Sequence, residues 1–159
     1  MNKVLLIVDM QNGLVNNDNY KKLIKKIDEL IAKGDYDKYI FTKFVNKKKS
    51  LFERRLNYSN LQSKGSQSIC VKIPENALVF EKYGYGLELK DLEQIKALGV
   101  DSVDVCGIQT DACVYAISLE LWDNGIYPNV LINYTATDPK REKQSKQMLI
   151  HQFGQVDER

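Results

Sequence analysis

One cysteine stands where the sequence favours nucleophilic chemistry, at the junction between a predicted strand and a predicted helix. An apolar stretch at 102–106 leads into Gly107, and a helical pattern of apolar residues occupies 114–122. We therefore expect Cys113 in the first turn of a helix, where free N–H groups and the helix dipole favour a thiolate. The same N–H groups are suited to holding an oxyanion. Taken alone, a cysteine is more often a small buried apolar residue.

Two further ionisable residues follow predicted strands and are candidates for activating this thiol. Asp9 comes directly after the apolar run 4–8, and Lys82 follows a short strand at 77–80. A thiol needs a base to take its proton, and a nearby cation favours its charged form. We expect Asp9 to be that base and Lys82 to orient it. Considered separately, Asp9 would cap a turn and Lys82 would be a solvated lysine.

The elements that must position these residues alternate between strand and helix. Strands are predicted at 4–8, 38–45, 77–80, 102–106 and 129–133, and helices at 20–32, 87–98, 112–124 and 139–153. This alternation predicts an α/β fold with three layers, α-β-α, around a mostly parallel, doubly wound sheet. Sites in such folds lie at the carboxyl ends of the strands, beside the point where the strand order reverses. Asp9 and Gly107 are both expected at that edge.

The connection 46–67 is the least regular part of the sequence. It is polar and basic, but Leu51, Phe52 and Leu56 indicate a short helix, and 59–68 is predicted as loop. A connection this long inside a compact domain is usually functional or partly structured. Its basic run from Lys47 to Arg55 is therefore either an exposed loop or a segment that reaches the site.

Length and composition predict a single domain, 1–159, of the globular class. Apolar residues make up 43% and charged residues 28%, and a net charge of +2 is too small to indicate nucleic acid or a membrane surface as partner. No run has the length of a signal core or a membrane span. Three cysteines are few and odd in number, as expected in a reducing cytoplasm. We predict a cytoplasmic protein that takes a small-molecule substrate.

A single histidine, His151, limits the chemistry further. This chain alone cannot build a multi-histidine zinc or iron site, and we expect no metal and no cofactor. A papain-like dyad of His151 with Cys113 is disfavoured, because His151 lies near the end of the last predicted helix.

Three linked motifs resemble the isochorismatase-like cysteine hydrolase superfamily, which includes nicotinamidases, N-carbamoylsarcosine amidases and isochorismatases. The motifs are VDMQN at 8–12, Lys82 after the short strand, and CGIQTDACV at 106–114. Their order and spacing both fit, and the resemblance extends from Val4 to about Val156. Three linked motifs are far more specific than one.

The resemblance implies that Asp9, Lys82 and Cys113 form a catalytic triad for hydrolysing a small amide or related C–N bond through a thioester. It also implies a non-proline cis peptide between Ile108 and Gln109. The N–H groups of Gln109 and Cys113 would then form the oxyanion hole. Dimers and tetramers are common in the superfamily, so a homo-oligomer is expected.

The sequence also departs from this pattern. Nicotinamidases carry a metal-binding Asp-x-His motif and a second His after the second strand, whereas residues 42–50 contain no histidine. We therefore expect metal-independent activity, and nicotinamidase activity is disfavoured. The chain is also short for the superfamily, which predicts that a final strand and helix are missing. A binding or regulatory protein on the same fold is the alternative function.

The remaining candidates concern the wall of the site. Gln11, Phe44, Tyr85 and Arg54 are predicted to contact substrate, and Arg54 would suit a carboxylate, although an exposed basic loop explains it equally well. The Gln11 amide points either to the site or to a loop backbone. The polar residues just before Cys113, Thr110 and Asp111, are expected to cap its helix.

Overall fold

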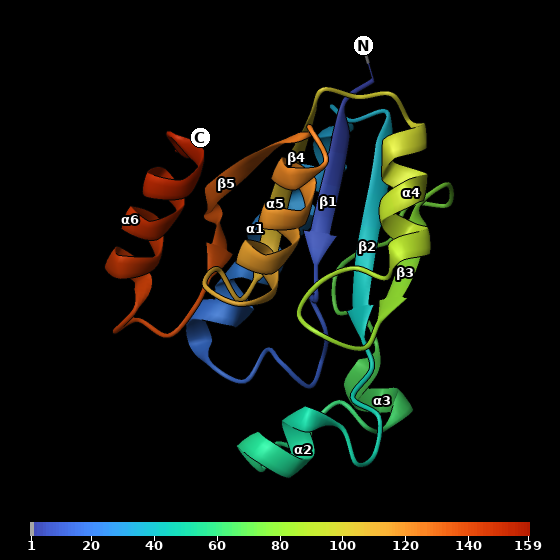
Figure 1. Ribbon diagram of the computed structural model, residues 1–159, viewed down its shortest axis with the longest axis vertical. Helices are drawn as coiled ribbons and strands as arrows, with labels where there is room; N and C mark the ends of the chain where they lie inside the picture. The colour runs from blue at the N-terminus through green and yellow to red at the C-terminus, as the bar shows by residue number, and fades with distance from the viewer. Residues whose placement is uncertain (1) are drawn as a thin grey trace.

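A five-stranded parallel sheet forms the centre of the computed structural model, which describes residues 2–159 (Figure 1). In chain order its strands are β1 (Val4–Val8), β2 (Lys38–Phe44), β3 (Leu78–Lys82), β4 (Ser102–Ile108) and β5 (Tyr127–Ala136). Their order across the sheet is β3-β2-β1-β4-β5, and each neighbouring pair is parallel. The predicted three-layer α/β fold is confirmed, with a sheet that is parallel throughout.

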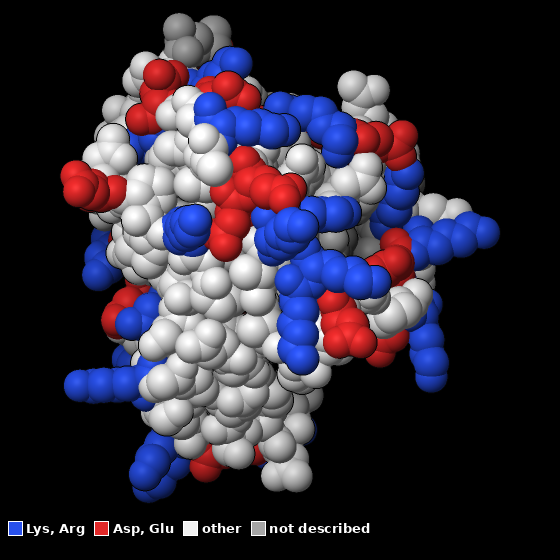
Figure 2. All heavy atoms as spheres, turned by 180° about the vertical axis from the view of Figure 1, so that it is seen from behind, with Lys and Arg blue, Asp and Glu red and all other residues white. Residues whose placement is uncertain are grey.

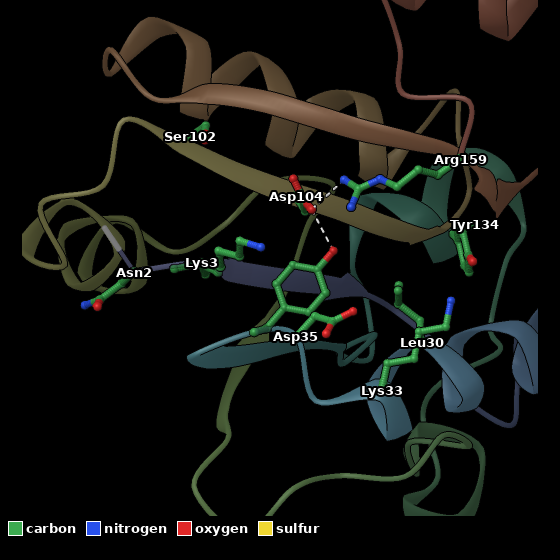
Figure 3. A pocket seen from close by; sticks show the side chains of 11 residues that line it. Asn2, Lys3, Leu30, Lys33, Asp35, Ser102, Asp104, Tyr134 and Arg159 are labelled. Atoms are coloured by element: carbon green, nitrogen blue, oxygen red, sulfur yellow. Dashed lines mark hydrogen bonds and ion pairs between the residues drawn. The ribbon is translucent and has the colours of Figure 1, made fainter.

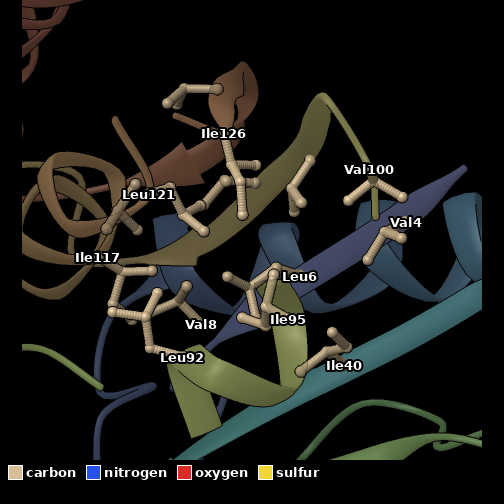
Figure 4. Packing of buried hydrophobic residues seen from close by; sticks show 14 of the residues in the cluster. Val4, Leu6, Val8, Ile40, Leu92, Ile95, Val100, Ile117, Leu121 and Ile126 are labelled. Atoms are coloured by element: carbon tan, nitrogen blue, oxygen red, sulfur yellow. The ribbon is translucent and has the colours of Figure 1, made fainter. Parts of the chain in front are cut away.

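Helices cover both faces of this sheet. Helix α1 (Asp18–Lys33) lies on one face, and α4 (Leu89–Ala97), α5 (Cys113–Asp123) and α6 (Glu142–Phe153) lie on the other (Figure 1). Strand β1 separates the two cores: Val4, Leu6 and Val8 join the cluster with α4, α5 and α6, while Leu5 and Ile7 join the cluster with α1. Alternate residues of a strand face opposite sides, so a strand buried on both faces must be apolar throughout. Figure 4 shows the first cluster.

Several boundaries differ from the prediction. Strand β3 extends to Lys82, and β4 continues through Gly107 to Ile108. The connection after β2 contains two short helices, α2 (Leu51–Leu56) and α3 (Lys64–Gln67), so the second half of the predicted loop is partly helical. Helix α6 begins at Glu142 rather than Pro139, because Asp138 forms a turn there and accepts hydrogen bonds from the N–H groups of Lys140 and Arg141.

Charges of both signs are mixed over the upper part of the face in Figure 2, and the lower part, toward the α2–α3 end, is mostly uncharged. A mixed-charge face of this kind does not favour a polyanionic partner. Among residues 2–159, no helix combines the length and apolarity needed to span a membrane.

Strand β4 approaches β1 most closely at Gly107, which is in register with Val8. A Cβ atom at Gly107 would lie 2.2 Å from the Val8 carbonyl oxygen and 2.7 Å from its nitrogen, and the φ angle is +113°. Only glycine adopts that conformation without strain, and backbone atoms cannot move aside as a flexible side chain does. Gly107 therefore lets the two strands that carry Asp9 and Gln109 lie side by side.

Replacing Gly107 with alanine is expected to lower the free energy of unfolding by at least about 2 kcal/mol, from backbone strain and overpacking together. Urea denaturation measures this change. The matched control is Gly65→Ala in α3, where no atom lies within 4 Å of the new Cβ. A Gly107→Ala protein as stable as Gly65→Ala would contradict the close approach of β1 and β4.

Candidate active site

Three residues far apart in the sequence meet at the carboxyl edge of the sheet. Asp9 directly follows β1, Lys82 is the last residue of β3, and Cys113 is the first residue of α5. The Lys82 Nζ atom lies 2.9 Å from Asp9 Oδ2 and 3.3 Å from Cys113 Sγ. The strand order reverses between β1 and β4, so this cluster lies where doubly wound folds place their sites.

The carboxylate of Asp9 is fully buried and held by Thr42 on β2. The Thr42 hydroxyl donates to Asp9 Oδ1 at 2.6 Å, and it accepts the Asp9 N–H at 3.1 Å. Oδ2 faces Lys82 and has no other partner within residues 2–159. The φ angle of Asp9 is +50°, a left-handed conformation that Asp adopts more readily than most residues. One carboxylate oxygen is thus held by Thr42 and the other pairs with Lys82.

The ammonium group of Lys82 is fully buried and surrounded by acceptors. Besides Asp9 and Cys113, it donates to the carbonyl oxygens of Gly84 at 2.7 Å and Tyr85 at 3.2 Å. Burial alone would lower the pKa of Lys82, but Asp9 and Cys113 outweigh it and the pKa is raised. Lys82 therefore stays charged and keeps a fixed position between the carboxylate and the thiol.

Burial also controls the thiol of Cys113. It raises the pKa of Cys113 well above the usual range for a cysteine; the charge of Asp9 raises it further, and Lys82 opposes both. Lys82 thus favours the thiolate, as we expected, but burial and the charge of Asp9 outweigh its effect. Because the buried Asp9–Lys82 pair is neutral as a whole, ionising the thiol would leave a net negative charge in the site. The thiol must therefore pass its proton to a neighbouring base as it reacts.

A pH titration of alkylation tests this state of the thiol. In a Cys70→Ser background, the rate of Cys113 alkylation by iodoacetamide is expected to rise steadily from pH 7 to pH 10, because only the thiolate reacts and its fraction grows toward a raised pKa. Cys70 is removed because its own pKa is raised only to about 11, and Cys106 is fully buried. A plateau reached by pH 7 would mean that the thiolate is already formed.

The two residues whose N–H groups are predicted to form the oxyanion hole lie at the same cavity. Gln109 and Cys113 both line it, and the Cys113 N–H has no acceptor inside the helix because α5 begins there. The peptide bond between Ile108 and Gln109 is cis. The Gln109 side chain is held by Tyr20 of α1, whose hydroxyl accepts a hydrogen bond from Gln109 Nε2 at 3.0 Å.

A cavity of about 210 Å³ opens onto the thiol. Apart from Asp9, Gln109 and Cys113, its wall is mostly apolar and aromatic: Leu14, Phe44, Phe52, Leu56, Tyr58, Tyr85, Ile108 and Ala112. Phe44 and Tyr85 thus lie where the sequence analysis expected substrate contacts. A wall of this kind suits a small neutral molecule with an apolar side.

Two predicted substrate contacts lie outside this cavity. Gln11 is fully buried, and its amide exchanges hydrogen bonds with the Phe44 backbone at 2.9 Å and donates to the Gln67 carbonyl at 2.9 Å. The amide thus contacts backbone at the ends of β2 and α3, and it points neither to the site nor to a loop. Arg54 is exposed, and its Nε donates to the Lys49 carbonyl at 2.9 Å, so its assignment to the pocket wall was wrong.

The connection 46–67 forms one wall of the cavity. Asn46 is buried at its start, and its amide donates to the carbonyls of Tyr58 at 3.0 Å and Asn60 at 2.8 Å. These bonds fold the segment back on itself, so that Phe52, Leu56 and Tyr58 face the thiol. Its length is thus explained by its contribution to the site.

The predicted helix caps are also corrected. The N-cap of α5 is Ala112, without a side-chain hydrogen bond. Thr110 instead donates to the Thr135 hydroxyl at 2.9 Å, and Asp111 accepts from Thr137 and Arg141, each at 2.6 Å. The Thr110 N–H also donates to the Ala136 carbonyl at the end of β5. The side chains of Thr110 and Asp111 therefore bind residues at or just after the end of β5, and neither caps the helix.

Sequence reasoning missed two residues that support the cluster. Thr42 lies in a strand that also contains Lys38 and Lys43, and a small polar residue next to Phe41 at its centre was a usable signal. Glu120, two turns along α5 from Cys113, accepts the Leu87 N–H at 2.9 Å. That contact ties the segment carrying the Gly84 and Tyr85 carbonyls to the helix that carries the thiol.

The residues of the site do not fit a metal ion. Asp9 is the only carboxylate in the cavity wall, and Lys82 occupies its open side. Within residues 2–159, no group of three or more His, Cys, Asp or Glu side chains is arranged to hold a metal. His151 is exposed in the last turn of α6.

A larger cavity, of about 550 Å³, lies at the opposite ends of the strands (Figure 3). One of its two carboxylates, Asp104, is bound by the Tyr36 hydroxyl at 2.6 Å, by Arg159 at 2.8 Å and by Asn129 at 2.7 Å. Its lining includes no cysteine or histidine. The smaller cavity at the thiol is therefore the candidate active site.

A family model of the isochorismatase domain matches residues 3–156. The chain belongs to the isochorismatase family. This is a family of hydrolases, and the resemblance drawn from the three motifs is confirmed. A search of curated proteins gives no match.

Solved structures share the fold of the isochorismatase family over nearly the whole chain. The pyrazinamidase of Pyrococcus horikoshii in complex with zinc is 20% identical, with a TM-score of 0.84 over 96% of this chain and 97% of that chain. Nicotinamidase from Bacillus subtilis is 15% identical, with a TM-score of 0.83 over 98% of this chain and 98% of that chain. N-carbamoylsarcosine amidase from Thermoplasma acidophilum is 17% identical, with a TM-score of 0.81 over 98% of this chain and 95% of that chain. The predicted loss of a final strand and helix was therefore wrong.

Proposed function

We propose that this chain is a metal-independent cysteine hydrolase of small amides or related C–N compounds. The observation that carries the proposal is the contact of Lys82 Nζ with both Asp9 Oδ2 and Cys113 Sγ beside a mostly apolar cavity. Membership of a hydrolase family supports it, as does the similarity in fold to three amidases.

In the first half-reaction, Cys113 Sγ attacks the amide carbon while its proton passes to Asp9 Oδ2, the carboxylate oxygen that pairs with Lys82. The carbonyl oxygen becomes an oxyanion, which the N–H groups of Gln109 and Cys113 stabilise. The C–N bond then breaks, and Asp9 returns the proton to the departing nitrogen. A thioester on Cys113 and a free amine or ammonia remain.

In the second half-reaction, water attacks the thioester carbon and Asp9 takes a proton from it. The C–S bond breaks, the proton returns to the sulfur, and a carboxylic acid leaves. In each half-reaction Asp9 thus accepts one proton and gives it back, first from the thiol to the departing nitrogen and then from water to the sulfur. Lys82 keeps the carboxylate oriented and neutralises its charge when it is ionised.

The proposal is metal-independent because the cavity holds one carboxylate, already paired with Lys82, and no histidine. The relatives named as nicotinamidases and pyrazinamidase include one in complex with zinc. Because the donor set at the cavity of this chain argues against a metal ion there, every step above uses the chain's own side chains.

Trapping the thioester tests the proposal. The protein, dialysed against EDTA, is mixed with a panel of small amides, quenched in acid and digested for peptide mass analysis. We expect an acyl adduct on the peptide that contains Cys113, and hydroxamate formation when hydroxylamine competes with water. A protein that binds these amides without an adduct or turnover would instead be the binding protein considered as the alternative.

A further inference from the structure

An apolar groove of about 560 Å³ lies beside the candidate active site, between α2 and the residues that follow β3. Its floor is formed by Leu51, Phe52 and Leu56 of α2 and by Tyr83 and Tyr85. Leu51 is 63% exposed, Leu56 61% and Tyr85 48%. Large apolar side chains gathered at this exposure mark a binding surface more often than a solvated one.

The groove adjoins the cavity at the thiol. Phe52, Leu56 and Tyr85 line both. The Phe52 ring lies between Phe44, at 4.9 Å, and Tyr85, at 5.0 Å, so a row of aromatic rings leads from the buried Lys82 outward. A molecule whose carbonyl is at Cys113 can therefore extend into the groove without crossing a polar barrier.

The groove is larger than the cavity at the thiol. At about 210 Å³, the cavity alone is smaller than a typical small-molecule pocket, which occupies roughly 300–1,000 Å³, whereas the groove alone falls within that range. The cavity is thus large enough for the reacting amide and a small group, and a longer substituent must enter the groove.

We propose that the groove is a substrate subsite for an extended apolar substituent of the amide, an alkyl chain or an aryl group. This inference rests on the proposed hydrolase function. The cationic side chains of Lys47 and Arg55 line the groove together with no carboxylate, and Lys47 lies 3.8 Å above the Tyr83 ring. The far end of the substituent is therefore neutral or anionic, and a cationic end is disfavoured.

An apolar surface of this kind could also bind a second copy of this chain. The shared wall with the thiol cavity favours the substrate, because a protein surface seated on α2 would close the opening through Phe52, Leu56 and Tyr85. The oligomeric state of a groove variant distinguishes the two.

The test compares kcat/KM along two series: unbranched alkanamides from acetamide to octanamide, and acetamides with N-alkyl groups of the same lengths. We expect one series to gain about twofold per methylene, since one-sided contact gives less than the roughly fourfold of full burial. An aminoalkyl analogue of the preferred length is expected to lose that gain.

Leu51→Asp should flatten the slope of that series, because Leu51 lines the groove and not the cavity. The control is Leu89→Asp, which changes another leucine, 72% exposed on α4, and should leave the slope intact. Flat slopes in both series, with the short amide still hydrolysed, would overturn the subsite alone. Hydrolysis of no amide would overturn the proposed function. Dissociation of an oligomer by Leu51→Asp would assign the groove to a second copy.

Discussion

Alanine in place of Cys113 is expected to lower kcat/KM for amide hydrolysis by at least about 10⁴-fold, as loss of a nucleophile does in other covalent hydrolases. No other side chain in the cavity wall can replace it, because the only additional ionisable groups lining it are Asp9, Tyr58 and Tyr85. Initial rates on a chromogenic anilide measure the loss. Serine at the same position should be nearly as inactive, since Asp9 must then deprotonate a much weaker acid.

The matched control is Cys70→Ser, which removes a thiol outside the cavity and should retain full activity. Thermal unfolding of Cys113→Ala should stay close to that of the unmodified protein, because the change removes one sulfur atom from the cavity wall and keeps the Cβ atom at the start of α5. Residual turnover within tenfold of the starting protein would exclude Cys113 as the nucleophile.

The second large effect is expected at Lys82, where one substitution should damage both activity and stability. Lys82→Met removes the only cation beside a fully buried carboxylate, and breaking a buried pair in this way typically costs about 3–5 kcal/mol. The Gly84 and Tyr85 carbonyls lose a donor at the same time. Urea denaturation and initial rates measure the two losses on one preparation.

A double variant separates the charge from the packing. In Asp9→Asn with Lys82→Met, no uncompensated charge remains, and asparagine tolerates the left-handed backbone at that position. We expect stability to recover by roughly 2 kcal/mol relative to Lys82→Met, while activity stays absent. Lys90→Met, at an exposed lysine on α4, is the control and should change neither quantity. A double variant no more stable than Lys82→Met would mean that the lysine contributes packing and not charge balance.

The sequence predicted the fold and the three central residues because each left a local signal. The run 4–8 can be so apolar only if both of its faces are buried, and Asp9, Lys82 and Cys113 each stand at the end or start of a regular element. Parallel strands then bring those ends to one edge whatever their separation in the chain. Local pattern and topology together were enough for this part of the site.

The rest of the site depends on contacts that no local pattern encodes. The side chain of Gln11 satisfies the backbone of a strand end and of a helix end, 33 and 56 residues away. The raised pKa of Cys113 depends on the burial of the thiol and on the charge of Asp9, and the position of a residue in a predicted helix encodes neither. Arg54 could not be placed either, because the fold of the connection is set by Asn46 at its start.

The cluster of Asp9, Lys82 and Cys113 has a consequence for how the protein acquires activity. Its members come from the beginning, middle and last third of the chain, and they meet only after β3 and β4 have joined opposite sides of the β2–β1 pair. An intermediate lacking either strand cannot hold all three residues together. Regain of turnover during refolding should therefore follow the joining of both β3 and β4 to the central pair, so the activity assay reports when that step is complete.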